Sequence, residues 1–182
     1  DGPPKIGPDV SVYHMDYEKG NFYQTNGELL GPVNGSPIEI AKVNKIYDAV
    51  PSQIRGWIWD IALDKNKRPV VTYSRYPSEN DHRYYYAFWD GSKWVDQEIS
   101  KSGGWMPSLK QGDRVQEAHY SGGVVLDHQD PSNVYLSHQV GGYFEIEHMR
   151  WNGKKWKVTP ITSNSTINNI RPYVVDGNTN RK

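Results

Sequence analysis

The side chains best suited to chemistry in this sequence are arginines, histidines and tyrosines at the starts of apolar segments. Arg55 and Arg171 lie at two such starts, and His119 and Tyr120 lie together at a third. An arginine guanidinium binds a carboxylate through two parallel charge-assisted hydrogen bonds. Two arginines beside a His–Tyr pair would therefore suit a sugar that carries a carboxylate. The alternative for each arginine is a structural role, in which it binds loop carbonyl groups.

One reaction that such a set could perform is β-elimination from a uronate. The carboxylate must be neutralised so that the C5 proton becomes acidic, a task for Arg55 or Arg171. A base and an acid must also lie near the bond, and His119 and Tyr120 can fill those roles. Adjacent strand residues point to opposite faces, so both rings reach one pocket only if the backbone is irregular, as Gly122-Gly123 would permit. Otherwise one of the two rings lies in the core. His119, Tyr120 and Arg171 are the predicted catalytic residues.

Several basic and aromatic residues nearby are predicted to contact the substrate. With Arg55, they are Trp57, His82, Arg83 and His138. His82 and His138 occupy equivalent loops of two successive repeats. The aromatic residues could also stack on sugar rings without any catalysis, which would make the protein a lectin-like binder or a structural domain. They are Trp57, Trp59, Trp105 and Tyr76.

Hydrolysis by a pair of carboxylates is the competing enzymatic chemistry. The available acids form no recognisable motif; they are Asp60, Glu79, Asp81, Asp113 and Glu117. No group of residues has the spacing of metal ligands, and the sequence contains no cysteine. We therefore expect no cofactor, while a structural calcium ion stays open.

A hairpin that occurs twice indicates how these residues are positioned. Trp89 and Trp94 recur 62 residues later as Trp151 and Trp156. Asp90-Gly91 and Asn152-Gly153 lie inside the two pairs, and such dipeptides supply the positive φ angles of tight hairpin turns. A fixed period of this length predicts a repeat architecture.

Each repeat reads as four antiparallel strands, and no segment has a helical period. The fold class is therefore all-β, and the units match blades of a β-propeller, with a β-sandwich of two similar sheets as the alternative. The predicted parts are a half blade at 10–24, blades at 54–100 and 117–162, and the first strand of a further blade at 168–182. Residues 25–53 read as a long connection. An open arc exposes packing faces, so we expect the remaining blades from a longer chain or from other copies.

In a four-stranded meander, alternate loops lie on opposite faces. The turns within the hairpins are short and repetitive, whereas the loops on the other face are longer and irregular, and function concentrates on irregular loops. All the predicted site residues belong to that second face. His128 lies in a short turn on the opposite face, where it reads as an ordinary turn residue.

The composition excludes some partners. Lys plus Arg equals Asp plus Glu at 21 each, so no net field favours nucleic acid. No stretch of about 18 apolar residues is present, so no membrane span is expected. The aromatic content of 13% indicates a core of aromatic and β-branched strands.

Five stretches together resemble the bacterial-neuraminidase-repeat (BNR) proteins of the sialidase-like propeller superfamily, in particular their polysaccharide-degrading branch. The stretches are Arg55–Asp60, His82–Ala87, Tyr120–Asp127 with Asp130-Pro131 after it, Val134–Ser137 and Asn169–Pro172. The hairpin turns resemble Asp-boxes, although the serine of that motif is missing. The resemblance implies a seven-bladed propeller, an acidic polysaccharide or oligosaccharide as partner, and a secreted or periplasmic location. It leaves open a lyase, a glycoside hydrolase of sialidase-like fold, or a carbohydrate-binding propeller without catalysis.

Overall fold

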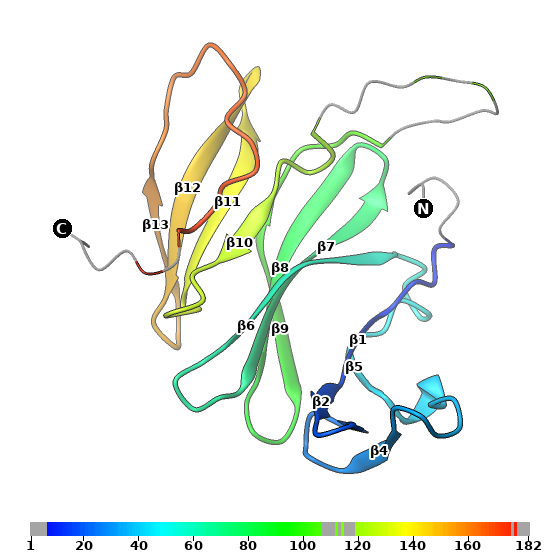
Figure 1. Cartoon of the computed structure of the whole chain (residues 1–182). Helices are drawn as coiled ribbons and strands as arrows, with labels where there is room; N and C mark the ends of the chain where they lie inside the picture. Colours follow the sequence, from blue (N-terminus) through cyan, green and yellow to red (C-terminus); the bar gives the residue numbers. More distant parts are fainter. Residues whose placement is uncertain (1–6, 107–111, 113, 115–118, 176, 178–182) are drawn as a thin grey trace.

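The computed structural model describes residues 7–106, 112, 114, 119–175 and 177, and its regular structure consists almost entirely of antiparallel β-sheet (Figure 1). The described residues contain one short 3₁₀ turn, η2 (Ile40–Lys42), and no α-helix. No helix in that part of the chain is long and apolar enough to cross a membrane. The prediction of an all-β chain is therefore confirmed.

Two four-stranded meanders form the body of the molecule. The first, blade A, contains β6 (Gly56–Leu63), β7 (Pro69–Ser78), β8 (Asp81–Trp89) and β9 (Trp94–Lys101) in that spatial order. The second, blade B, contains β10 (Val124–Leu126), β11 (Asn133–Val140), β12 (Tyr143–Trp151) and β13 (Trp156–Pro160), also in chain order. These sheets are consistent with propeller blades, and residues 117–118 of the predicted second unit lie outside the described residues.

The repeated hairpins form as predicted. Trp89 pairs with Trp94 at the end of β8–β9, and Trp151 pairs with Trp156 at the end of β12–β13. Both turns contain a glycine with positive φ, 109° at Gly91 and 91° at Gly153. Turn chemistry acts locally, and this explains why the sequence was sufficient to place these hairpins.

The N-terminal region contains more strand than predicted. β2 (Asp16–Glu18) and β3 (Asn21–Tyr23) make the expected hairpin, but β4 (Leu29–Pro32) extends it to three strands. β1 (Val12–His14) leaves this sheet and pairs with β5 (Asn44–Tyr47). The prediction of a connection without strands over 25–53 was therefore wrong. Strands of three or four residues are too short to show a clear alternation.

Two predicted strands are shorter in the structure or missing. The strand predicted at 120–127 is reduced to β10, because Tyr120, Gly122 and Gly123 have φ angles of 47°, 97° and 118°. The predicted strand at 168–182 does not form over its described residues. Arg171 has a φ of 55°, and its N–H donates to the Gly122 carbonyl at 2.7 Å. Pro172 has no N–H to continue a ladder.

The main core lies between the two blades. Residues from both sheets form one buried cluster, which contains Ala62, Val70, Tyr84, Tyr86, Val124, Leu126, Val134, Leu136 and Met149. The other face of blade A packs against β1 and β5 through Val71, Tyr73 and Ala87 on one side and Val12, Ile46 and Tyr47 on the other. Successive side chains of a strand point to opposite faces, so each face of blade A has its own neighbour.

Candidate functional site

Four residues come together near the starts of the inner strands: Arg55 before β6, Tyr76 near the end of β7, His82 at the start of β8 and Ser121 before β10. We call this group the strand-start cluster. The Arg55 guanidinium lies 5.8 Å from the centre of the Tyr76 ring. The Tyr76 and His82 rings meet edge to face with centres 4.6 Å apart. Nδ1 of His82 lies 2.9 Å from Oγ of Ser121, so the cluster joins blade A to the segment that precedes β10.

The electrostatics of the cluster make its two rings poor proton carriers. Burial lowers the pKa of His82 to about 4; the Glu79 carbonyl opposes this shift, and the nearby charges of Arg55 and His119 reinforce it. Burial also raises the pKa of Tyr76, against the hydroxyls of Ser121 and Ser74. Both side chains are thus neutral at neutral pH. His82, only 1% exposed, positions its neighbours in this structure and offers substrate little surface.

His119 and Tyr120 lie beside the cluster on an irregular backbone. The positive φ angles at Tyr120, Gly122 and Gly123 break the alternation that would have sent the two rings to opposite faces. As a result, both rings contact Trp105, with centres 6.1 Å away for His119 and 5.2 Å away for Tyr120. The structure therefore places a histidine and a tyrosine on the same indole.

A hydrogen bond selects the tautomer of His119. Its Nδ1 lies 3.0 Å from the carbonyl oxygen of Tyr120, and a carbonyl oxygen only accepts. In the neutral ring the proton therefore occupies Nδ1, and Nε2 has the lone pair. The His119 ring also packs against Phe144, with ring centres 4.5 Å apart. This arrangement is what a general base requires.

The turn that holds His119 and Tyr120 is anchored by Tyr84, which the sequence analysis did not identify. The Gly123 N–H donates to the Tyr84 hydroxyl at 2.7 Å, and this hydroxyl also contacts the carbonyls of Ser121 and Ser137. Burial raises the pKa of Tyr84 well above its usual range. Its position two residues after His82 on the same strand face is the signal that could have found it.

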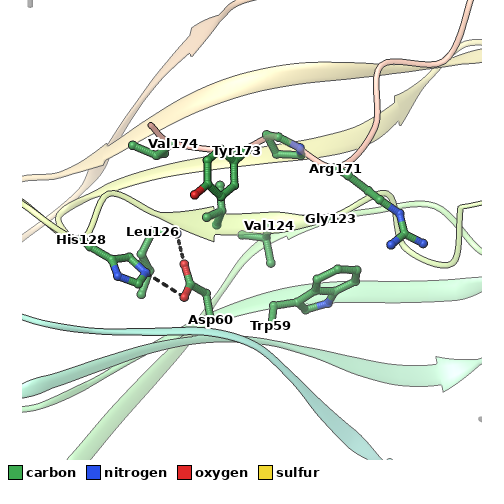
Figure 2. A pocket seen from close by; sticks show the side chains of 11 residues that line it. Trp59, Asp60, Gly123, Val124, Leu126, His128, Arg171, Tyr173 and Val174 are labelled. Carbon is green, nitrogen blue, oxygen red and sulfur yellow. Dashed lines mark hydrogen bonds and ion pairs between the residues drawn. The ribbon is translucent and has the colours of Figure 1, made fainter. Parts of the chain in front are cut away.

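A groove continues from this region along the inner strands (Figure 2). It has a volume of about 360 Å³ and is lined by β6, by β10 and by the segment 171–174. In Figure 2, Arg171 lies at one end of the groove and His128 at the other, with Trp59 and Asp60 side by side between them. Arg171 is joined to the His119 turn by the hydrogen bond from its N–H to Gly122.

A β-bulge in β6 aims two adjacent side chains into the groove. Ile58 pairs with Tyr73 and Asp60 pairs with Thr72, which leaves Trp59 as an extra residue. Bulges re-aim side chains and are frequent beside active sites. Here the bulge brings both Trp59 and Asp60 to the groove.

The remaining predicted contacts lie elsewhere. Arg83 makes ion pairs with Asp81 and Glu98 at 2.7 and 3.3 Å. His138 lies on β11 with Nε2 3.3 Å from Glu147. Trp57 is on β6, 36% exposed and paired with Ser74. Among the described residues, none of these three side chains forms a hydrogen bond, ion pair or ring contact with the strand-start cluster.

The acids available for the competing chemistry are also placed. Asp60 lines the groove, whereas Asp81 is paired with Arg83. Asp113 and Glu117 lie outside the described residues. Among the described residues, no group of three or more His, Asp and Glu side chains could hold a metal ion.

Comparison with known proteins identifies the family. A sequence model described as "BNR repeat-containing family member" matches residues 4–102, just over half of the chain. The chain belongs to this BNR repeat-containing family. The matched region spans the N-terminal strands and blade A, and blade B, which repeats the hairpin of blade A, lies outside the match. Searches of curated proteins and of solved structures gave no match. Membership of this family indicates that the chain is part of a sialidase-like propeller related to carbohydrates.

Proposed function

We propose that this chain binds and cleaves an acidic, uronate-containing polysaccharide by β-elimination. The observation that carries the proposal is the pair His119 and Tyr120 on Trp105, with His119 in the tautomer of a base. The backbone N–H of Arg171 donates to Gly122 of the same turn, which makes Arg171 the first candidate for the cation that binds the carboxylate.

The proposed roles follow from the chemistry of elimination. Arg171, with Arg55 as the second candidate, neutralises the uronate carboxylate and makes the C5 proton acidic. Nε2 of His119 removes that proton, the C5–H electron pair forms the C4–C5 double bond, and the bond from C4 to the leaving oxygen breaks. Tyr120 gives its hydroxyl proton to the leaving oxygen. The products are an unsaturated uronate and a chain with a new hydroxyl group.

A binding function without catalysis is the second candidate, and Trp105 is the observation that favours it. A tryptophan flanked by His119 and Tyr120 offers an aromatic surface for a sugar ring whether or not a reaction follows. A polymeric sugar substrate would also fit a secreted or periplasmic protein. Cell fractionation with an antibody to the chain would test that location.

One assay separates these functions. The protein is incubated with a panel of uronate-rich polysaccharides, and the ultraviolet absorbance of unsaturated uronate is followed together with the release of reducing ends. Growth of both signals supports elimination. Reducing ends without absorbance would indicate a hydrolase. Binding in affinity electrophoresis with neither signal would identify a carbohydrate-binding protein and reject the catalytic roles.

A further inference from the structure

We propose that the groove between β6, β10 and the segment 171–174 is an extended saccharide-binding site, with the Asp60–His128 pair as its second polar anchor. This inference rests on the proposed function and adds to it the place where the sugar units next to the cleaved bond are held. The sequence analysis named Asp60 only as one of the acids available for hydrolysis, and it predicted His128 to be an ordinary turn residue on the opposite face.

The geometry of the pair defines what it offers to a ligand. Oδ1 of Asp60 lies 2.9 Å from Nε2 of His128, and Oδ2 accepts the Leu126 N–H at 2.9 Å. A carboxylate only accepts, so in the neutral ring Nε2 is the protonated nitrogen and Nδ1 is an acceptor. The His128 side chain is 50% exposed, whereas Asp60 is 17% exposed. The carboxylate thus orients a partly exposed imidazole that can accept a hydrogen bond from a sugar hydroxyl.

The hydrogen bonds and the repeat indicate that Asp60 does more than join the two blades. The bond that joins the blades uses Oδ2, which accepts the Leu126 N–H, whereas Oδ1 accepts the Ile61 N–H at 2.8 Å and also faces His128. The position equivalent to Asp60 in blade B, 63 residues later in the alignment that matches Leu63 to Leu126, is Gly123. The framework of the repeat therefore does not require a carboxylate at this point.

The two ends of the groove offer different contacts to an acidic oligosaccharide. Arg171 can bind a carboxylate in bidentate fashion, and the His128 imidazole can accept from a hydroxyl. Trp59 lines the groove between β6 and Arg171, with its Nε1–H donated to Ser74 Oγ at 2.6 Å, which fixes the indole. A volume of about 360 Å³ lies within the usual range of small-ligand sites, about 300–1,000 Å³. The occupant that fits is an acidic oligosaccharide laid along the inner strands.

The test is calorimetric titration with tetramers of galacturonate, guluronate and glucuronate, and with their methyl esters. The protein variants are Asp60→Asn, His128→Gln and Arg171→Lys. Asparagine at position 60 keeps an oxygen that can accept the Leu126 N–H, and His128→Gln does not change the partner of that N–H. At least one of these two variants should therefore fold. Arg150→Lys, an exposed arginine on β12, and His148→Gln, a histidine bonded to Asn133, are the matched controls.

We expect the best-binding tetramer to lose about tenfold in affinity with Asp60→Asn and with His128→Gln, and to be unchanged in both controls. Its methyl ester should bind the parent protein as weakly as the acid binds Arg171→Lys. Hydrogen exchange should show ligand-induced protection of residues 124–128. Wild-type affinity in both Asp60→Asn and His128→Gln, with loss only in Arg171→Lys, would overturn the groove and leave the proposed function standing. Binding of no tetramer by the parent protein would overturn both.

Discussion

Blades A and B are built on the same hairpin but differ at the opposite ends of their strands. The turns are equivalent, since Oδ1 of Asp90 accepts the N–H groups of Ser92 and Lys93, and Oδ1 of Asn152 accepts those of Lys154 and Lys155. The inner strands are not equivalent. β6 has eight residues and a bulge, whereas β10 has three residues and follows two glycines with positive φ.

This difference separates framework from function. Hairpin ends must keep their geometry so that successive blades stack, and they repeat almost residue by residue. The strand starts are free of that constraint, and each has a different local irregularity. Each irregularity brings two neighbouring side chains to a shared location. In blade A, Trp59 and Asp60 both line the groove, and in blade B, His119 and Tyr120 both contact Trp105.

The largest effect is expected where the irregularity of blade B presents the proposed base. His119→Ala should lower turnover about 10²- to 10⁴-fold, since it removes general-base catalysis, with little change in KM. His148→Gln, in the framework of the same blade, should leave turnover unchanged. Steady-state kinetics on the best polysaccharide of the panel measure both. Full activity of His119→Ala would show that His119 is not the base and that the irregular strand start of blade B does not serve catalysis.

The glycines of blade B provide the next test. A Cβ at Gly122 would lie 2.7 Å from the Phe144 ring and 3.0 Å from the Ser137 carbonyl, and φ is positive. Gly122→Ala should therefore lower the free energy of unfolding by about 2–5 kcal/mol, from backbone strain and overpacking together. At Gly153 nothing lies within 4 Å, so Gly153→Ala should cost only the strain, about 1–2 kcal/mol. Urea denaturation measures both losses, and equal losses would contradict this reasoning.

Tyr84 tests how blade A supports the strand start of blade B. Tyr84→Phe removes the buried hydroxyl that binds the Gly123 N–H and the Ser121 and Ser137 carbonyls. We expect a loss of about 1–3 kcal/mol in the free energy of unfolding, because these polar groups stay buried without a partner. The position equivalent to Tyr84 in blade B is Ile146, so the loss should have no counterpart there.

Tyr85→Phe is the matched control for this prediction. Its hydroxyl contacts Glu98 at 3.0 Å near the surface, and its removal should change stability by about 0.5 kcal/mol or less. Thermal denaturation of both variants gives the comparison. Similar losses in the two would show that the Tyr84 hydroxyl has no special role.

The smallest effect concerns the part of the blades that is most alike. Hydrogen bonds from Lys93 and Ser92 lower the pKa of Asp90, so its carboxylate stabilises the fold above the unfolded-state pKa of about 3.9. That contribution is lost as the pH falls through the lower pKa of the folded state. Asp90→Asn, which copies the turn of blade B, should leave stability near neutral pH almost unchanged and reduce the loss in acid. Thermal unfolding from pH 7 to pH 2 measures this, and an unchanged acid profile would show that Asp90 does not contribute.

The sequence by itself determined the features that depend on neighbouring residues. Asp-Gly and Asn-Gly set the two hairpins, alternating apolar residues set the long strands, and the 62-residue spacing of the tryptophans set the repeat. It also indicated that Gly122-Gly123 would permit His119 and Tyr120 to share a site. The short β4 and β5 were missed because a few residues cannot show a period.

Only the tertiary structure decided what meets across the two blades. The anchoring of the His119 turn by Tyr84 and the contact of His128 with Asp60 join residues that lie 37 or more positions apart. The bulge at Trp59 depends on the pairing register of β6 with β7. Strand pairing is non-local, so the residue that will face a given side chain is not encoded in its own neighbourhood. For this reason a turn histidine on the supposed far face became one end of the groove.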